Sequence, residues 1–377
     1  MKKILMISFS DLKNDPRVRR HINFLKEKYY VHAVGYENPE IDGVRFTKVS
    51  IKQSDTYDKI QKLLQLSFRN FDKYYWGKYD FSQVFKIVGK EKFDVIIAND
   101  ANTLPLAFKL KGDAKIVFDA HEYAPLEFED SLYWRWFFKP LANYICQKYI
   151  KHVDTMITVG EIIAKEYEKN FNVAPIVITN APGYKSDLKP VFSEGEKIRI
   201  IHNGNAFPSR KIEVMIEVMK YLDDKYELYL MLLKNDIKYL SKLKNLSVKM
   251  KNVFFLEPVS NDKVIEEINK YDVGLHILAP TNFNNTSALP NKFFEFIQAR
   301  LAIVIGPSPE MANILKRYNL GLVSEDFTPL KIADTLKKLN RQNIYEFKIN
   351  ADKAAFELSA EANKIKLQNL IGDIIGE

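Results

Sequence analysis

Short apolar segments alternate with stretches of helical periodicity along this whole chain of 377 residues. A brief apolar run suits a strand that is buried on both faces, and apolar residues spaced three or four apart suit the helix that covers it. Repetition of this pair is typical of βα units and of a parallel sheet. The alternation therefore restricts the chain to an α/β fold.

The predicted strands form two groups on either side of a polar stretch rich in turn residues, at 180–190. The first group is expected near residues 4–8, 31–35, 45–49, 95–98, 116–119, 156–159 and 176–179. The second is expected near 198–202, 228–233, 253–256, 273–277, 302–305 and 322–324. Helical patterns include 211–222, 263–270 and the tail at 351–375. We predict an N-terminal Rossmann-like domain at 1–182, a linker at 183–195, a second Rossmann-like domain at 196–355 and a C-terminal helix at 356–377.

Composition narrows the class of protein. The length exceeds that of one average domain. The chain has 56 basic and 48 acidic residues, a net charge of +8, which favours phosphate-rich ligands, nucleic acid or an anionic membrane. A single cysteine, Cys146, excludes an internal disulfide and a cysteine-rich zinc site, so a reducing compartment fits. The apolar opening is interrupted by Ser8 and Asp11, so we interpret it as a buried strand, and no apolar run reaches the roughly 18 residues of a membrane span.

One segment, from Ser287 to Gly306, combines a polar loop, an amphipathic helix and an apolar strand. Pro290 suits the first turn of that helix, where free amide groups and the helix dipole favour an anion such as phosphate. Glu295 follows about one turn later on the polar side. The buried side is expected to be formed by Phe293, Phe294, Phe296 and Ile297. A ligand carrying both hydroxyls and phosphates, such as a nucleotide-sugar, suits this arrangement.

A second loop follows the first strand of the second domain, at 202–211. A turn at Gly204 and Asn205 leads to the cations Arg210 and Lys211 ahead of a predicted helix. Such a loop can bring amide groups and a guanidinium against a diphosphate. A turn with two solvated cations is the alternative.

Two further motifs lie in the first domain. His121 and Glu122 follow an apolar strand, where a site residue is expected, and a histidine there can titrate near neutral pH or bind a sugar hydroxyl. The alternative is a loop histidine packed on Tyr123. Asp15 and Arg17 follow the first strand; Asp15 can cap a helix, while Arg17 or Arg20 can face a ligand. The absence of a Gly-x-Gly-x-x-Gly turn here argues against a dehydrogenase.

Two aromatic and basic clusters, at 74–79 and 133–139, also lie in the first half. Aromatic rings beside cations suit a membrane interface with anionic lipid. Ordinary core packing is the alternative. Stacking on single-stranded nucleic acid is a third possibility, but no nucleic-acid motif accompanies the clusters, so no nucleic acid is expected as a partner.

Taken together, these motifs resemble those of retaining glycosyltransferases of family four, which have the GT-B fold of two Rossmann-like domains facing a cleft. The resemblance rests on Asp15-Pro-Arg17, on Asp119-x-His121-Glu122, on the loop from Gly204 to Lys211 and on Pro290-Asn291-Lys292-x-x-Glu295, which occur in the family's order. It implies that the last helix crosses back to the first domain. Where the longer form of the family motif has a first glutamate, this chain has Ser287.

The resemblance implies a retaining transferase that moves a sugar from a nucleotide-sugar, UDP-linked rather than GDP-linked, to a hydroxyl of a growing and lipid-linked glycan of a bacterial surface polysaccharide. Arg210 or Lys211 would neutralise the leaving diphosphate, Glu295 would hold the ribose, and His121 would touch the donor sugar or the acceptor. The donor would also meet residues at the two loops and the helix start: Gly204, Asn205, Ser287, Ala288, Leu289, Asn291 and Lys292. No metal or cofactor is expected, because the Asp-x-Asp triplet that holds a metal in the other main glycosyltransferase fold is absent. The implied location is the cytoplasm, at the inner face of the membrane.

Two alternatives remain open from the sequence. Nucleotide-sugar 2-epimerases share the two-domain architecture, although a soluble substrate would not explain the aromatic clusters. A non-catalytic subunit that binds a nucleotide-sugar or a glycan within an assembly complex is the other alternative, and Ser287 in place of a glutamate is the feature that supports it.

Overall fold

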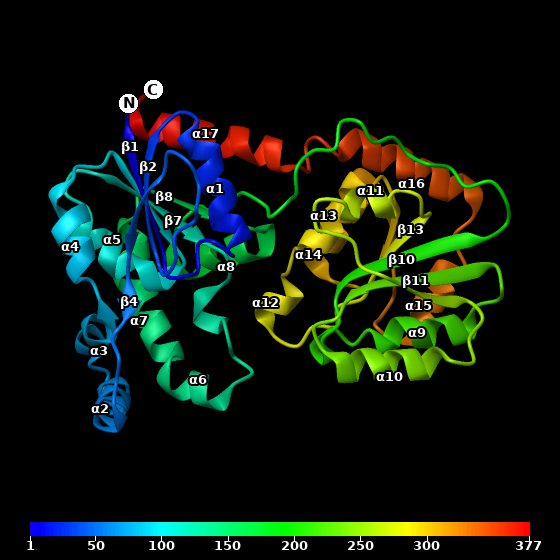
Figure 1. Ribbon diagram of the computed structural model, residues 1–377, viewed down its shortest axis with the longest axis horizontal. Helices are drawn as coiled ribbons and strands as arrows, with labels where there is room; N and C mark the ends of the chain where they lie inside the picture. Colours follow the sequence, from blue (N-terminus) through cyan, green and yellow to red (C-terminus); the bar gives the residue numbers. More distant parts are fainter. The chain divides into compact units, whose positions relative to one another are not determined.

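A computed structural model describes all residues from Met1 to Glu377. The chain forms two compact units, each built on a parallel sheet flanked by helices (Figure 1). Unit 1 comprises Met1–Thr179, Asn282–Asn284 and Lys364–Glu377, and unit 2 comprises Asn180–Thr281 and Asn285–Asn363. The predicted α/β fold of two Rossmann-like domains is confirmed.

The sheet of unit 1 has seven strands in the order β3-β2-β1-β6-β7-β8-β9, and every pairing is parallel. The strands are β1 (Lys3–Ser8), β2 (Tyr30–Gly35), β3 (Arg45–Lys48), β6 (Val95–Asn99), β7 (Lys115–Ala120), β8 (Thr155–Thr158) and β9 (Ile176–Val177). The chain order reverses between β1 and β6, and ligands of such sheets bind beyond the carboxyl ends of the strands at this point. Unit 1 therefore presents the loops after Ser8 and Asn99 as one candidate site.

The bounds of the helices of unit 1 are α1 (Pro16–Lys26), α2 (Thr56–Ser67), α3 (Phe71–Lys78), α4 (Ser82–Ile87), α5 (Leu104–Leu110), α6 (Leu132–Phe137), α7 (Lys139–Tyr149) and α8 (Glu161–Phe171). Helix α17 (Ala360–Ile375) begins in unit 2 and belongs to unit 1 from Lys364 onward. Short 3₁₀ turns lie at η1 (Val88–Lys90), η2 (Ala101–Thr103), η3 (Ala124–Leu126) and η4 (Ile150–His152). Asp15 caps α1 by accepting a hydrogen bond from the amide of Val18, as its sequence position predicts.

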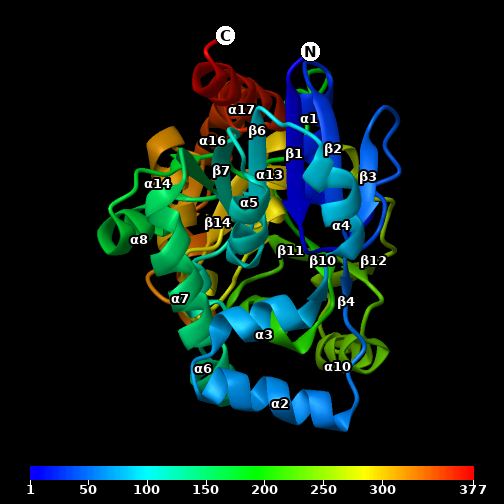
Figure 2. The ribbon, with the colours of Figure 1, turned by 90° about the vertical axis from the view of Figure 1, so that its left-hand side faces the viewer.

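One part of unit 1 was not expected from the sequence. Strands β4 (Ser50–Ile51) and β5 (Tyr79–Asp80) form a small antiparallel pair, and α2, α3 and α6 lie near it, away from the chain termini (Figure 2). The pair is too short to leave a period-2 pattern in the sequence. It joins α3 to the main body of the unit.

The sheet of unit 2 has six parallel strands in the order β12-β11-β10-β13-β14-β15. The strands are β10 (Ile198–Asn205), β11 (Tyr226–Leu233), β12 (Val253–Leu256), β13 (Val273–His276), β14 (Ala302–Ile305) and β15 (Gly321–Val323). Ile200 and Ile201, adjacent on β10, pack into two different hydrophobic clusters, one on each face of the sheet. The chain order reverses between β10 and β13, which places the ends of these two strands at the binding edge of the unit.

The helices of unit 2 are α9 (Glu213–Val218), α10 (Ile237–Ser247), α11 (Val264–Ile268), α13 (Asn291–Gln298), α14 (Pro309–Tyr318), α15 (Pro329–Leu336) and α16 (Arg341–Ala354), with 3₁₀ turns at η5 (Pro208–Arg210) and η6 (Met219–Tyr221). The short helix α12 (Phe283–Thr286) is divided between the units. Three details of the sequence interpretation were wrong. Lys211 is left-handed, so the helix begins at Glu213; the helical tail is interrupted between α16 and α17; and Pro290 is the residue that caps α13, not one inside its first turn.

Candidate functional site

Helix α13 is held close to the sheet of unit 2 by a glycine. A methyl group at Gly274 of β13 would lie only 2.4 Å from the ring of Phe296, so only glycine lets this ring approach the strand so closely. Phe293, Phe294, Phe296 and Ile297 are all fully buried, as predicted. Their packing turns Lys292 and Glu295 toward the ends of β10 and β13, and leaves Asn291 exposed at the helix start.

Lys292 lies against the end of β10. Its ammonium Nζ is 3.4 Å from Nε2 of His202, and a Cβ atom built on Gly204 would lie 2.6 Å from the same Nζ. Gly204 also has φ +128, a conformation that other residues rarely adopt. The pKa of Lys292 is lowered to about 8, mainly by burial and further by Arg210, while the neighbouring Glu295 opposes the change.

Glu295 is held by an amide that the sequence analysis did not single out. Asn203 Nδ2 donates to Glu295 Oε2 over 2.8 Å, and Asn203 is itself buried at the end of β10. The carboxylate is therefore fixed in orientation while half-exposed. A polar residue just ahead of Gly204 was the available signal, but its partner, 92 positions away, could not be inferred from spacing.

The two candidate cations of the loop, Arg210 and Lys211, differ in their surroundings. Arg210 lies near enough to Lys292, His202 and His276 to lower the pKa of all three, although for each of them burial has the larger effect. Lys211 has no such influence, and its left-handed backbone ends the 3₁₀ turn. Asn205 and both cations are exposed, and neither cation forms an ion pair. The geometry favours Arg210 as the cation that belongs with Lys292.

The loop ahead of α13 is more buried than a simple binding loop. The side chain of Leu289 packs in the core of unit 2, and Ala288 is half-buried. Ser287 is buried, and its hydroxyl makes no hydrogen bond within the chain. The side chain of Leu289 is therefore not available to a ligand.

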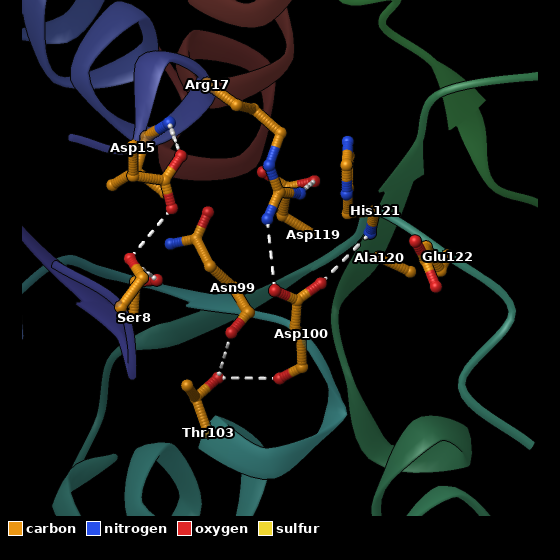
Figure 3. Close-up of polar contacts among 12 residues, drawn as sticks. Ser8, Asp15, Arg17, Asn99, Asp100, Thr103, Asp119, Ala120, His121 and Glu122 are labelled. Carbon is orange, nitrogen blue, oxygen red and sulfur yellow. Dashed lines mark hydrogen bonds and ion pairs between the residues drawn. The ribbon is translucent and has the colours of Figure 1, made fainter. Parts of the chain in front are cut away.

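In unit 1, residues at the carboxyl ends of β6 and β7 and on α1 form a network of charges that is largely buried, except at Asp100 (Figure 3). Arg17 pairs through Nη1 with Asp119 at 3.0 Å and through Nη2 with Asp100 at 3.2 Å. The second oxygen of Asp119 lies 3.2 Å from Nδ1 of His21. Burial opposes ionisation of Asp119, but Arg17 and His21 outweigh it and hold its pKa below the ordinary value. Arg17, expected at a binding surface, is thus committed to two carboxylates.

His121 and Glu122 lie at the edge of this network. The backbone amide of His121 donates to Asp100 Oδ1 over 3.2 Å, and both side chains are half-buried. Burial and then the charge of Arg17 lower the pKa of His121, against the opposing effects of Asp100 and Asp119. A neutral imidazole at this position can hydrogen-bond a hydroxyl group.

An additional carboxylate, Glu127, was missed by the sequence analysis. Burial, and then the nearby charges of Glu122 and Asp100, raise its pKa to about 7. The same causes, burial first and then Asp100, raise the pKa of Glu122, while Arg17 lowers it. A glutamate six residues beyond a histidine gives no sequence signal of its own.

The loop from Tyr123 to Leu126 is also fixed by a short segment from a distant part of the chain. Asn284 accepts from the amide of Tyr123 over 2.8 Å and donates to the carbonyl groups of Tyr123 and Leu126. The ring of Phe283 stands edge-on to that of Tyr123. These contacts explain why Asn282–Asn284 belong to unit 1.

The aromatic clusters behave differently from each other. Tyr74, Tyr75 and Tyr79 are buried in the core of unit 1, so packing explains the first cluster. In the second, Tyr133 and Trp136 are exposed on α6. No helix of the structure combines the length and the apolar character needed to cross a bilayer. No group of three or more His, Cys, Asp or Glu side chains is arranged to bind a metal ion.

Comparison with known proteins gives a family match over part of the chain and a fold over all of it. Residues 28–182 match the family model Glycosyltransferase Family 4. No curated protein matches the sequence. Among solved structures, HepE from Anabaena in complex with UDP and glucose is 11% identical, with 99% of this chain and 100% of that chain covered at a TM-score of 0.65.

Two other structures show the same architecture. The sucrose-phosphate synthase from Thermosynechococcus elongatus is 11% identical, with 100% of both chains covered at a TM-score of 0.70. WaaG, a glycosyltransferase involved in lipopolysaccharide biosynthesis, is 15% identical, with 99% of this chain and 100% of that chain covered at a TM-score of 0.64. The predicted GT-B fold is therefore confirmed over the whole chain.

Proposed function

We propose that this chain is a glycosyltransferase that transfers a sugar from a nucleotide-sugar to a hydroxyl of a growing glycan, with retention of configuration, and the match of residues 28–182 to Glycosyltransferase Family 4 supports this proposal. The observation that carries this proposal is the grouping of Lys292, Arg210 and the start of α13 around Gly204 in unit 2. The family domain favours the transferase over the epimerase and over a binding subunit without activity.

The proposed chemistry needs a site that stabilises a leaving diphosphate. When the bond between the anomeric carbon and the diphosphate oxygen breaks, negative charge grows on that oxygen and positive charge on the sugar ring. Two cations and the amide groups at a helix start are suited to this charge, and they need no metal. We assign Arg210 and Lys292 to the diphosphate and Glu295 to the ribose hydroxyls.

His121 is the proposed contact of unit 1 with the donor sugar or the acceptor. Its lowered pKa keeps the ring neutral at neutral pH, which suits a hydrogen bond to a hydroxyl. We propose a UDP-linked donor and a lipid-linked acceptor of surface polysaccharide synthesis. The UDP complexes of HepE and the lipopolysaccharide role of WaaG support these choices by analogy of fold.

A thermal-shift titration with UDP, GDP, ADP and NAD tests the donor site. A ligand that binds only the folded protein raises its stability by mass action, by about 2.7 kcal/mol at a hundred times its dissociation constant. We expect UDP to raise the melting temperature and Glu295→Ala to abolish this shift. The proposal would be contradicted if a short oligonucleotide raised the melting temperature and none of the nucleotides did.

We also propose that unit 1 binds to an anionic membrane. The proposal is based on one surface, here named the α2–α6 patch. Its large apolar side chains are exposed, Phe68 to 79% and Trp136 to 72%. The other exposed members are Tyr57, Ile60, Leu63, Leu64, Leu132 and Tyr133. Arg69 Nη1 donates to the carbonyl of Trp136 over 3.5 Å and so links the two helices.

Cations border this patch and complement an anionic surface. Lys59, Arg69 and Arg135 are exposed, Lys62 is half-buried, and none of the four forms an ion pair. Cations beside exposed rings and aliphatic side chains are suited to the headgroup region of a bilayer. The patch extends the membrane interpretation to α2, which the sequence analysis overlooked.

Vesicle sedimentation tests this surface. We expect the protein to bind vesicles containing phosphatidylglycerol, to bind purely zwitterionic vesicles weakly, and to be released by salt. The double variant Phe68→Ser/Trp136→Ser should lower binding about tenfold or more, since each buried CH₂ group contributes about 0.8 kcal/mol. Ile237→Ser, at an equally exposed position of unit 2, is the control. Equal losses in both variants would contradict the proposal.

A further inference from the structure

The histidine beside Lys292 has a defined tautomer. Nδ1 of His202 lies 2.9 Å from the backbone carbonyl of Leu275, which can only accept a hydrogen bond. The proton must therefore be on Nδ1, and Nε2 carries a lone pair. This lone pair faces the ammonium of Lys292 at 3.4 Å, so the lysine donates and the imidazole accepts.

His202 is also uncharged. It is only 2% exposed. Burial and then the nearby Lys292 and His276 drive its pKa well below the ordinary value, although the hydrogen bond to Leu275 opposes them. A neutral acceptor orients an ammonium group without cancelling its charge. This differs from unit 1, where two carboxylates neutralise Arg17.

The position of Lys292 is confined on a second side. A Cβ atom at Gly204 would lie 2.6 Å from Nζ and 3.0 Å from Cε, so a larger residue there would displace the end of the lysine side chain from its present position. A long side chain that is fixed before binding loses less conformational entropy when its ligand arrives. Lys292 is therefore preorganised between Gly204 and His202.

We propose that His202 is a positioning residue, whose neutral imidazole orients Lys292, a cation that forms no ion pair, for the donor diphosphate. The inference rests on the proposed function for the identity of the ligand. The orientation of Lys292 by His202 stands on the two contacts at β10 and β13 and does not require a nucleotide.

A second histidine provides a matched control. His276, on β13, stacks parallel to His202 with 6.0 Å between ring centres and is likewise buried. Neither of its ring nitrogens has a hydrogen-bond partner. His202→Phe removes the acceptor and keeps a flat ring, and His276→Phe makes the same change one strand away. His202→Gln restores an acceptor near the position of Nε2.

The pH at which Lys292 titrates distinguishes two roles of His202. It should change if His202 accepts a hydrogen bond from Lys292, and it should not change if His202 only fills space. Groups that face this lysine are Glu295 on its own helix, Arg210 from the loop, and His202 and His276 from the strands. The protonated lysine binds an anion, so UDP affinity should fall as pH rises through about 8, the pKa of Lys292. Without its acceptor, the buried ammonium is less stable, and the midpoint should move to lower pH.

The test follows UDP binding by calorimetry across this pH range, and lysine titration by NMR in protein without nucleotide. We expect His202→Phe to weaken UDP binding about tenfold, a change in binding free energy of about 1.4 kcal/mol. We expect His202→Gln and His276→Phe to stay close to the wild type in affinity and midpoint.

Three outcomes would overturn the inference: an unchanged Lys292 midpoint in His202→Phe, equal effects of the two phenylalanine variants, or no recovery in His202→Gln. A wild-type protein that binds no nucleoside diphosphate would overturn the proposed function instead. In that case the NMR midpoint still decides whether His202 positions Lys292.

Discussion

Replacing Arg210 by alanine is expected to lower the rate of sugar transfer about a hundredfold, the typical effect of removing one group that stabilises developing negative charge. The guanidinium is exposed and forms no ion pair, so its charge is available to a ligand. Its charge lowers the pKa of Lys292, so the two cations lie in the same part of unit 2. The measurement is the initial rate of UDP release from UDP-sugar with a glycan acceptor.

The matched control for this prediction is the adjacent Lys211→Ala. The two residues carry the same charge and are both exposed, but Lys211 is in the left-handed conformation that ends the turn, and it does not affect Lys292. We expect a loss of less than about threefold for Lys211→Ala, in the range of a screened surface charge. A larger loss for Lys211→Ala than for Arg210→Ala would show that the diphosphate is assigned to the wrong cation.

The contrast between these neighbours also shows where sequence reasoning ends. Two consecutive cations after a glycine turn predict a phosphate site. Which of the two faces that site depends on the backbone conformation, here φ 46 at Lys211. The next residue, Ile212, packs into the core of unit 2, and the chain direction that this packing requires cannot be inferred from the two cations alone. The strands of both parallel sheets, by contrast, lie where the sequence predicted them, and those buried on both faces, such as β6 and β14, leave a continuous apolar run.

The residues that the sequence analysis missed share a different cause. Asn203, Asp100 and Glu127 are ordinary polar residues, and their importance arises from partners far away in the chain. The α2–α6 patch was missed because α2 has the pattern of a helix packed on a core, yet only Leu66 of this helix is buried. Periodicity identifies an apolar face but does not identify what covers it.

Replacing Arg17 by methionine is expected to destabilise the protein by about 3 kcal/mol or more, because it leaves the buried charge of Asp119 with His21 as its remaining partner. Asp119 is 2% exposed and depends on Arg17 for its main compensation. Urea denaturation followed by tryptophan fluorescence measures this effect in unit 1, since Trp76, Trp134 and Trp136 all belong to it. The double variant Arg17→Met/Asp119→Leu should recover part of the lost stability, because it also removes the buried carboxylate of Asp119.

An exposed pair in the same unit isolates the effect of burial. Lys48 and Glu37 are 2.7 Å apart, yet both side chains are more than half exposed. Lys48→Met should therefore change the stability by less than about 1 kcal/mol.

The pH dependence of stability gives an independent check. The pKa of Asp119 is below its unfolded value of about 3.9, so its stabilisation is present above that pH and is lost as pH falls further. If Arg17→Met and Lys48→Met have equal effects, or if acid sensitivity persists unchanged in Arg17→Met/Asp119→Leu, the network does not stabilise unit 1 in this way.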